Sequence, residues 1–303
     1  MDTRFEKLSQ SQKERLAFVE FRAYFLGEVK RADIIERFGL ATAAATRDIA
    51  LYRTISNENI SLDPRTKTYL PRHDFKPIFE HLPERVLSAL SQGFGEGIGG
   101  RSRPLIPCET PLPLNLPDMA ILAPLTQAIY RRKTVRVTYH SFSSGQNERE
   151  IVPFALANNG LRWHVRAFDR RRKQFLDFVL TRISSSEIVW DSRLDEFEEP
   201  SNDIQWSRIV ELELVPHPGK DHHEIIAMDY GMAIQDKLLK VQVRAALAGY
   251  FLRQWSVDCS EDHSLDAPEV RLWLRNPLSL YGVGSADLAP GYQPRDKKEK
   301  NNT

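Results

Sequence analysis

The chain has few cysteines and no long apolar run. Its only two cysteines, Cys108 and Cys259, lie far apart and at no spacing typical of metal ligands. They are expected to be reduced thiols of a cytoplasmic protein rather than a disulfide framework. No stretch is apolar for long enough to cross a bilayer, and the first residues lack the core of a signal peptide. We therefore expect no membrane partner.

The chain also lacks an excess of charge of either sign. Its 42 Lys and Arg residues face 41 Asp and Glu residues, for a formal net charge of +1. This balance excludes a uniformly basic coat for nucleic acid, so any anion-binding site must be local. A length of 303 residues predicts two or three domains rather than one simple core.

Motifs typical of catalysis are missing too. No Gly-x-Ser-x-Gly, paired-carboxylate or His-Glu-x-x-His pattern occurs, and the glycines at 97–100 lack the Lys-Ser/Thr of a phosphate loop. His217, His222, His223 and Glu224 suggest a metal site, but adjacent histidines on a helix point apart. A polar cluster at a helix start is the favoured interpretation. We predict no enzyme activity, no metal and no cofactor.

Residues 161–183 are the most informative stretch that is present. Two runs with strand-like alternation, the second over Phe175–Ile183, flank a turn over Asp169–Lys173, and six cationic side chains lie between Arg162 and Lys173. Trp163 is predicted to face the core with Val165 and Ala167. Such charge density on one hairpin indicates a polyanionic partner, although Arg170–Lys173 alone are better interpreted as a solvated turn.

Residues 11–55 predict three helices that suit DNA. Apolar stripes mark helices over 11–26 and 32–38, Gly39 permits a tight turn, and Thr42 is expected to cap a helix to about Ile55. One side of this third helix is apolar (Ala45, Ile49 and Tyr52, with Asp48). The other is small, polar and cationic (Thr42, Ala43, Thr46, Arg47, Ala50 and Thr54), which suits the floor of a major groove.

A basic hairpin follows the third helix. Ile60–Leu62 and Lys67–Leu70 are predicted strands around a turn at residues 63–66. Arg65 and Lys67 are expected to follow the DNA backbone as a wing, and Arg53 to contact a phosphate. A plain helical bundle would show some of the same pattern, but the order of elements favours a winged helix-turn-helix domain over residues 1–75.

A spacer and a β-rich segment come next. Residues 76–132 are predicted to be a helical linker, with helical material over Phe75–Leu90, a loop rich in Gly and Pro, and a helix over Met119–Arg132. From Thr134 onward, short alternating runs at close spacing predict a small β-barrel over residues 133–195.

Four segments of that region resemble the WYL domain: residues 135–142, 151–156, 163–169 and 178–183. The resemblance implies an SH3/Sm-like barrel behind an N-terminal winged helix, in a bacterial transcription factor similar to repressors that accompany phage-defence islands such as BREX and CBASS systems. His164 stands where the family has the Tyr of its Trp-Tyr-Leu triplet. The resemblance also implies a site for a nucleotide or oligonucleotide effector, lined by Tyr139, His140, Ser141, His164, Arg166 and Arg182.

Residues 196–294 predict a small α+β domain. Strands over Trp206–Pro216, Leu238–Ala245 and Val270–Leu274 alternate with helices over Lys220–Met228 and Ala246–Trp255. The resemblance implies that this extension forms a homodimer. Residues 295–303 are expected to be a disordered tail. The whole chain is thus predicted to be a multidomain α+β protein.

The favoured function is a homodimeric repressor that binds an inverted-repeat operator in double-stranded DNA and is released by the effector. The alternative is a nucleic-acid-binding adaptor that delivers a defence enzyme to DNA. Hydrolysis of a cyclic nucleotide is a third hypothesis, and it needs a general base for which His164 is the only candidate.

Overall fold

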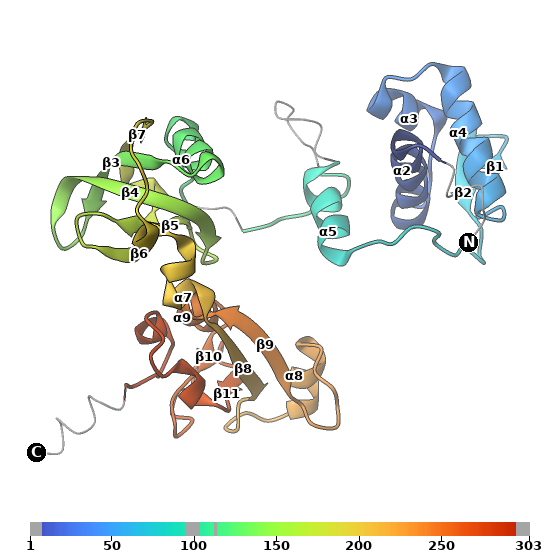
Figure 1. Cartoon of the computed structure of the whole chain (residues 1–303). Helices are drawn as coiled ribbons and strands as arrows, with labels where there is room; N and C mark the ends of the chain where they lie inside the picture. Colours follow the sequence, from blue (N-terminus) through green and yellow to red (C-terminus); the bar gives the residue numbers. More distant parts are fainter. Residues whose placement is uncertain (1–7, 95–103, 112–113, 295–303) are drawn as a thin grey trace, which may run out of the picture. The chain divides into compact units, whose positions relative to one another are not determined.

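The structure is a computed structural model that describes residues 8–94, 104–111 and 114–294. The chain forms two compact units, Met1–Pro111 and Leu112–Thr303, and Figure 1 labels their helices and strands. The predicted disordered tail and the glycines at 97–100 lie outside the described residues.

Three helices form the core of the first unit, as the apolar periodicity predicts. They are α2 (Gln10–Leu26), α3 (Arg31–Phe38) and α4 (Thr42–Ile55). Gly27 and Gly39 end the first two helices with φ of 76° and 61°, a backbone region that favours glycine. The expected cap by Thr42 is wrong, because Ala41 holds the N-cap position and the Thr42 carbonyl accepts a bond from Thr46 Oγ1 inside the helix.

The predicted wing is present as an antiparallel hairpin. Strand β1 (Ile60–Asp63) pairs with β2 (Thr68–Pro71) from Ile60 opposite Pro71 to Asp63 opposite Thr68. Tyr69 also exchanges two backbone hydrogen bonds with Val29, of 2.9 and 3.0 Å, which fasten the hairpin to the segment between α2 and α3. The hairpin is therefore a fixed part of the helical unit.

A buried carboxylate holds the chain after the wing against α2. Glu20 is fully buried and accepts hydrogen bonds from Tyr52 Oη and from the backbone N–H of Ile78 and of Phe79, each at 2.9 Å. His81 Nε2 lies 3.0 Å from the same carboxylate. Burial raises the pKa of Tyr52, and the neighbouring Glu20 carboxylate adds to that rise.

These bonds use backbone N–H groups that a helix would need, so helix α5 (Pro83–Gln92) begins later than the predicted Phe75. Pro83 stands in its first turn, where a missing N–H costs nothing.

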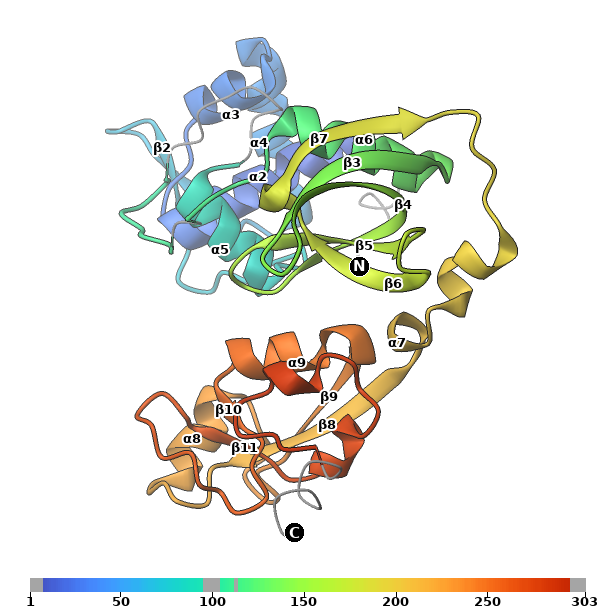
Figure 2. The same ribbon diagram turned by 90° about the vertical axis from the view of Figure 1, so that its left-hand side faces the viewer.

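The second unit contains a curved antiparallel sheet of five strands, which Figure 2 shows from the side. Its strands are β3 (Thr134–Ser141), β4 (Gly145–Asn158), β5 (Trp163–Asp169), β6 (Gln174–Val179) and β7 (Ile183–Val189), and the order is β6-β5-β4-β3-β7. Helix α6 (Met119–Arg131) packs against this sheet with Leu125 and Ala128 buried. No hydrogen-bonded pairing joins the edges β6 and β7 in the described residues, so the expected closed barrel is replaced by an open sheet.

Two predictions about the arginine-rich hairpin are wrong. The strand expected over Phe175–Ile183 ends at Val179, where a 3₁₀ turn (Leu180–Arg182) redirects the chain into β7. Val165 and Ala167 are fully buried as predicted, but Trp163 is 41% exposed. Trp163 faces Asn158 in the last residue pair of the ladder, so it lies at the open end of the sheet, beyond the core.

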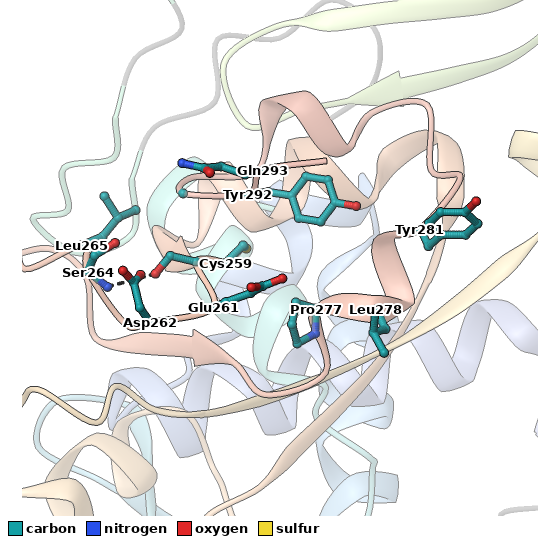
Figure 3. Close-up of a pocket in the computed structure, with 12 residues that line it drawn as sticks. Cys259, Glu261, Asp262, Ser264, Leu265, Pro277, Leu278, Tyr281, Tyr292 and Gln293 are labelled. Atoms are coloured by element: carbon teal, nitrogen blue, oxygen red, sulfur yellow. Dashed lines mark hydrogen bonds between the residues drawn. The ribbon is translucent and has the colours of Figure 1, made fainter. Parts of the chain in front are cut away.

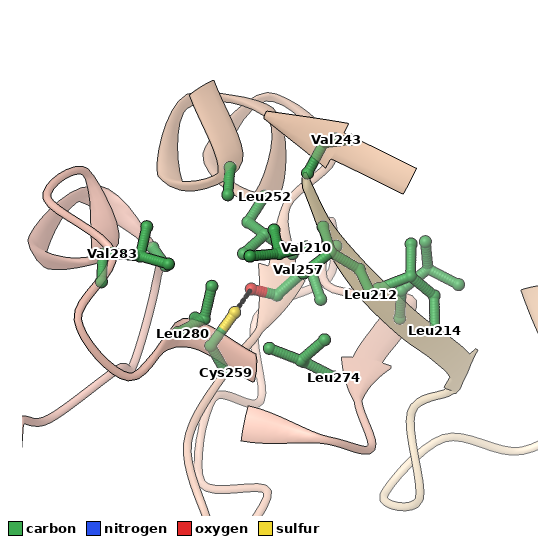
Figure 4. Close-up of a cluster of buried hydrophobic side chains, with 14 of the residues drawn as sticks. Val210, Leu212, Leu214, Val243, Leu252, Val257, Cys259, Leu274, Leu280 and Val283 are labelled. Atoms are coloured by element: carbon green, nitrogen blue, oxygen red, sulfur yellow. Dashed lines mark hydrogen bonds between the residues drawn. The ribbon is translucent and has the colours of Figure 1, made fainter. Parts of the chain in front are cut away.

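The C-terminal part is a small α+β domain, as predicted. Short α7 (Ile204–Ser207) precedes β8 (Ile209–Pro216), so the strand does not begin at Trp206. The domain continues with α8 (His223–Asp229), β9 (Leu239–Arg244), α9 (Ala245–Gln254), β10 (Val257–Asp258) and β11 (Leu272–Leu274). The strands form one mixed sheet in the order β10-β11-β8-β9. Figure 4 shows its core, where the buried Cys259 lies near Leu280, Val257 and Leu274, and burial raises the pKa of its thiol.

The histidine cluster has a structural explanation. His217 is fully buried beyond the end of β8, and its Nδ1 accepts the Gly219 N–H at 3.0 Å. Its other nitrogen, Nε2, therefore carries the proton and donates to Asp258 Oδ2 at 3.1 Å. His217 is thus not part of a helix start. Across the described ranges, no three His, Cys, Asp or Glu side chains gather to hold a metal ion.

No helix within residues 8–94, 104–111 or 114–294 is long and apolar enough to span a membrane.

Replacing Glu20 by Ala should loosen the first unit. The change leaves the Tyr52 hydroxyl and two backbone N–H groups buried without their acceptor, a cost of about 3 kcal/mol. Hydrogen exchange of amides in α2 and α4 should accelerate roughly 100-fold. Glu36→Ala, at an exposed position of α3, is the matched control and should leave the exchange rates unchanged. Equal protection in both variants would contradict the role assigned to Glu20.

Candidate DNA-binding surface and effector pocket

Helix α4 separates its residues as the helical wheel predicts. Ala45, Asp48, Ile49 and Tyr52 are buried, and the predicted contact residues Thr42, Ala43, Thr46 and Arg47 are exposed, as are Ala50 and Thr54. Asp48 pairs with Arg15, whose Nε lies 2.6 Å from Asp48 Oδ2. The negative charge of α4 is thus neutralised on its inner side, and Arg47 provides a cation on its outer side.

The remaining predicted DNA contacts are Arg65 and Lys67 of the hairpin and Arg53 of α4. Arg65 and Lys67 are exposed in the turn of the hairpin. Backbone hydrogen bonding from Arg65 lowers the pKa of Asp63, which closes that turn. Arg53 is half-buried and forms an ion pair with Glu58, so it must exchange that partner to contact a phosphate.

The six predicted effector residues separate into two groups. Tyr139, His164 and Arg182 line one cavity of about 470 Å³, between the central sheet and α9. The other three are not among its lining residues. His140 is exposed and lies 3.0 Å from Ser184 Oγ, and Ser141 Oγ lies 3.1 Å from Ser143 Oγ.

Arg166 is buried, only 6% exposed, and is engaged by carboxylates. It donates through Nε and Nη2 to both oxygens of Asp203, at 2.8 and 3.1 Å. Its Nη1 lies 3.2 Å from Asp177 Oδ1 as an ion pair. Asp203 in turn accepts the N–H groups of Gln205 and Trp206 at the start of α7. Arg166 therefore joins the central sheet to the C-terminal domain instead of presenting its guanidinium to a ligand.

Asp177 brings a carboxylate into the cavity that sequence patterns did not reveal. Burial raises its pKa, and the Arg166 charge acts against that rise. Tyr250 of α9 donates to Asp177 Oδ2 at 3.5 Å, and burial raises the pKa of Tyr250 to about 12. Burial lowers the pKa of His164, whose ring lies 5.4 Å from that of Tyr250, so the neutral imidazole is favoured near pH 7.

The cavity also contains cations that the prediction missed. Arg162 and Arg253 line it together with Arg182, whose guanidinium lies 3.9 Å from the centre of the Phe142 ring. Arg162 Nε is buried and has no hydrogen-bond partner among the described atoms. Tyr250 and Arg253 are three residues apart on α9, a spacing that places them on one helix face. Only the tertiary fold brings that face to residues some 70 to 110 positions earlier.

The arginine-rich turn is only partly solvated. Arg170 donates to Glu198 at 2.7 and 2.8 Å and to the Arg193 carbonyl at 2.7 Å, so the interpretation as a solvated turn is wrong for Arg170. Arg171, Arg172 and Lys173 are exposed, as expected.

A second cavity, of about 310 Å³, lies within the C-terminal domain and is drawn in Figure 3. Glu261 and Asp262 line it together with Tyr281 and Tyr292, and the lining residues include no Lys, Arg or His. Its carboxylates disfavour phosphate, so the cavity beside α9 is the better nucleotide site of the two.

Three family models match the chain in sequence order. Residues 11–92 match the winged helix-turn-helix domain of the BrxR transcriptional regulator, and residues 120–188 match the WYL domain. Residues 209–280 match the C-terminal dimerization domain of BrxR.

Curated relatives match almost the whole chain. The DNA-binding transcriptional repressor CapW of Pseudomonas aeruginosa is 30% identical over 275 residues, which are 88% of this chain and 89% of that protein. The chain belongs to the CapW family. CapW of Stenotrophomonas maltophilia is 29% identical over 287 residues, 89% of this chain and 94% of its own. Among solved structures, the proteasome accessory factor B/C of Arthrobacter aurescens matches 92% of this chain and 46% of its own, with 14% identity and a TM-score of 0.25.

Arg166→Met should destabilise the second unit of this CapW-family protein by about 3 kcal/mol, because Asp203 and Asp177 lose their buried cationic partner. All five tryptophans lie after residue 112, so urea unfolding followed by tryptophan fluorescence reports on this unit alone. Arg171→Met, at an exposed arginine of the same hairpin, should change stability by no more than about 0.5 kcal/mol. Similar midpoints for the two variants would contradict the role assigned to Arg166.

Proposed function

We propose that this CapW-family protein is a homodimeric, sequence-specific DNA-binding repressor of a phage-defence operon, released when a nucleotide or oligonucleotide binds beside α9. The observation that carries the DNA-binding part is the outer face of α4, small and cationic over a fully packed inner face. The curated CapW relatives are named DNA-binding transcriptional repressors, and the dimerization-domain match supports two copies acting together.

The geometry of α4 suits direct contact with bases. Ala43, Thr46 and Ala50 have short side chains, which let the helix axis approach the groove floor, and Arg47 can donate two bonds to guanine. Arg65 and Lys67 lie in the fixed hairpin, from which they would contact phosphates on the flank. Two copies would place two α4 helices in successive major grooves of an inverted repeat.

The decisive experiment compares binding to the upstream promoter of the protein's own gene with binding to a scrambled duplex, over a salt series. The intact protein should prefer the promoter. Arg47→Ala should weaken promoter binding by about 1–3 kcal/mol and reduce the preference, because a base contact is lost.

Arg171→Ala removes one exposed arginine from the second unit and is the matched control. It should bind the promoter like the unchanged protein. An Arg47 variant with unchanged promoter affinity would remove α4 from the groove. Equal and steeply salt-dependent binding to both duplexes would instead indicate phosphate contacts alone and favour the adaptor function.

The cavity beside α9 supports a nucleotide-like effector. Arg162, Arg182 and Arg253 offer charge-assisted donors for phosphate, and the aromatic residues Tyr139, His164 and Tyr250 line the same cavity, where a base would need such neighbours. Asp177 lies in the same cavity and is joined through Arg166 to Asp203, at the entry to the C-terminal domain. A bound anion would compete for these ion pairs, and we propose that it thereby changes how the sheet meets the dimer-forming domain.

Arg182→Ala should separate promoter binding from oligonucleotide binding. A short phosphorylated single-stranded oligonucleotide should lower the promoter affinity of the unchanged protein. The variant should keep promoter binding but bind the oligonucleotide about 2 kcal/mol more weakly, roughly 30-fold, because one charge-assisted contact is lost. Fluorescence anisotropy with labelled promoter and labelled oligonucleotide measures both. Loss of promoter binding in Arg182→Ala would instead make the sheet a DNA-contacting element.

A further inference from the structure

Helix α8 of the C-terminal domain, labelled in Figure 1, has apolar residues on two opposite sides. Ile226 and Ala227 are buried against the domain core, and Met232 joins them just beyond the helix. On the other side, Ile225 is 58% exposed and Met228 76%, and beyond the end of the helix Tyr230 is 36% and Ile234 71% exposed. We name Ile225, Met228, Tyr230 and Ile234 the α8 patch.

A helix with apolar side chains on two opposite sides can bury one side in its own domain and leave the other for an interface. Ile225 and Met228 lie three residues apart and so share one face of α8. Scattered exposed apolar side chains are ordinary, but four large ones within ten residues of the chain are a local concentration of apolar surface that water solvates poorly.

The exposed face of the domain's sheet is built differently. Lys240 on β9 lies 2.9 Å from Glu211 and 3.3 Å from Glu213 on β8, and Arg275, which follows β11, lies 2.7 Å from Glu213. The charges of these side chains are paired with one another, and such a polar surface is stable in contact with water. Compared with this charged face of the sheet, the α8 patch therefore gains more free energy when another surface covers it.

We propose that the α8 patch is the centre of the homodimer interface, covered by the same patch of a second copy. The inference rests on the proposed homodimer, and the patch lies inside residues 209–280, which match a C-terminal dimerization domain. A two-fold interface must be self-complementary, and an apolar patch meets that condition without any charge pattern.

The rim of the patch fits this arrangement. Glu224, in the first turn of α8, pairs with Lys237, which follows the patch in the chain. Two copies meeting at α8 would thus enclose apolar side chains beside this compensated pair, with the exposed carboxylate of Asp229 at the end of α8 on the rim.

The test introduces charge where the helix tolerates it. Glutamate suits the first turn of a helix and lysine the last, so Ile225→Glu and Met228→Lys, made singly, should preserve α8. Each places the same charge on both copies near the axis. Light scattering coupled to size-exclusion chromatography should give the unchanged protein twice the chain mass of 34.9 kDa, and each variant 34.9 kDa.

Leu278→Asp is the matched control. Leu278 is 60% exposed and lies in the same domain but outside the patch, so this variant should stay dimeric. Far-UV circular dichroism should match the unchanged protein in all three variants, while the thermal midpoint should match only in Leu278→Asp and fall in the two monomeric variants, which lose the stabilisation that the dimer provides. Mixing Met228→Lys with Met228→Glu should restore a heterodimer, because opposite charges then face each other.

The possible outcomes distinguish a wrong location of the interface from the absence of a homodimer. Folded Ile225→Glu and Met228→Lys proteins that remain dimeric would overturn the α8 patch while leaving the homodimer intact. A Leu278→Asp monomer would then move the interface to that side of the domain. An unchanged protein that runs at 34.9 kDa would overturn the proposed homodimer itself.

Discussion

The second unit depends on the need to neutralise one buried positive charge. Arg166 lies in the middle of β5 with its guanidinium out of water, and a charge in that position is stable only if carboxylates surround it. Asp177 supplies one from the next strand and Asp203 another from the start of α7. Asp203 also caps α7, the helix that leads into the C-terminal domain. The ion pair with Arg166 therefore fixes the position of this helix against the sheet. The two regions matched by separate family models are thereby joined by electrostatics.

The first unit uses the same principle with the opposite charge. Glu20 is buried at the centre of α2 and is satisfied by Tyr52 of α4, two backbone N–H groups and His81. These contacts hold the chain that leaves the wing against the helices, and they anchor α4 from its inner side. The outer side of α4 takes no part in this packing. A rigid helix with an uncommitted, small and cationic face is what base recognition requires.

Buried ion pairs also explain why an arginine-rich hairpin does not repel itself. Arg166 and Arg170 are each held by acidic side chains that come from later in the chain, and only Arg171, Arg172 and Lys173 remain in solvent. The cations left for an anionic ligand are instead Arg162, Arg182 and Arg253, which meet around one cavity. Charge density in the sequence thus did not distinguish Arg166, whose charge is paired, from Arg162 and Arg182, which line the cavity, because a sequence does not show which charges are already paired.

The sequence by itself determined the elements whose signals are local. Apolar periodicity and glycine placement gave α2, α3 and α4 and the outward face of α4, and the four WYL-like segments identified the middle domain. Tertiary structure decided what depends on distant partners: the break at Leu180–Arg182, the exposure of Trp163, the late start of α5, and the pairing of Arg166. Periodicity records which face of an element is apolar. It carries no information about which carboxylate, dozens of residues away, will neutralise a given arginine, because that choice is made only when the chain folds.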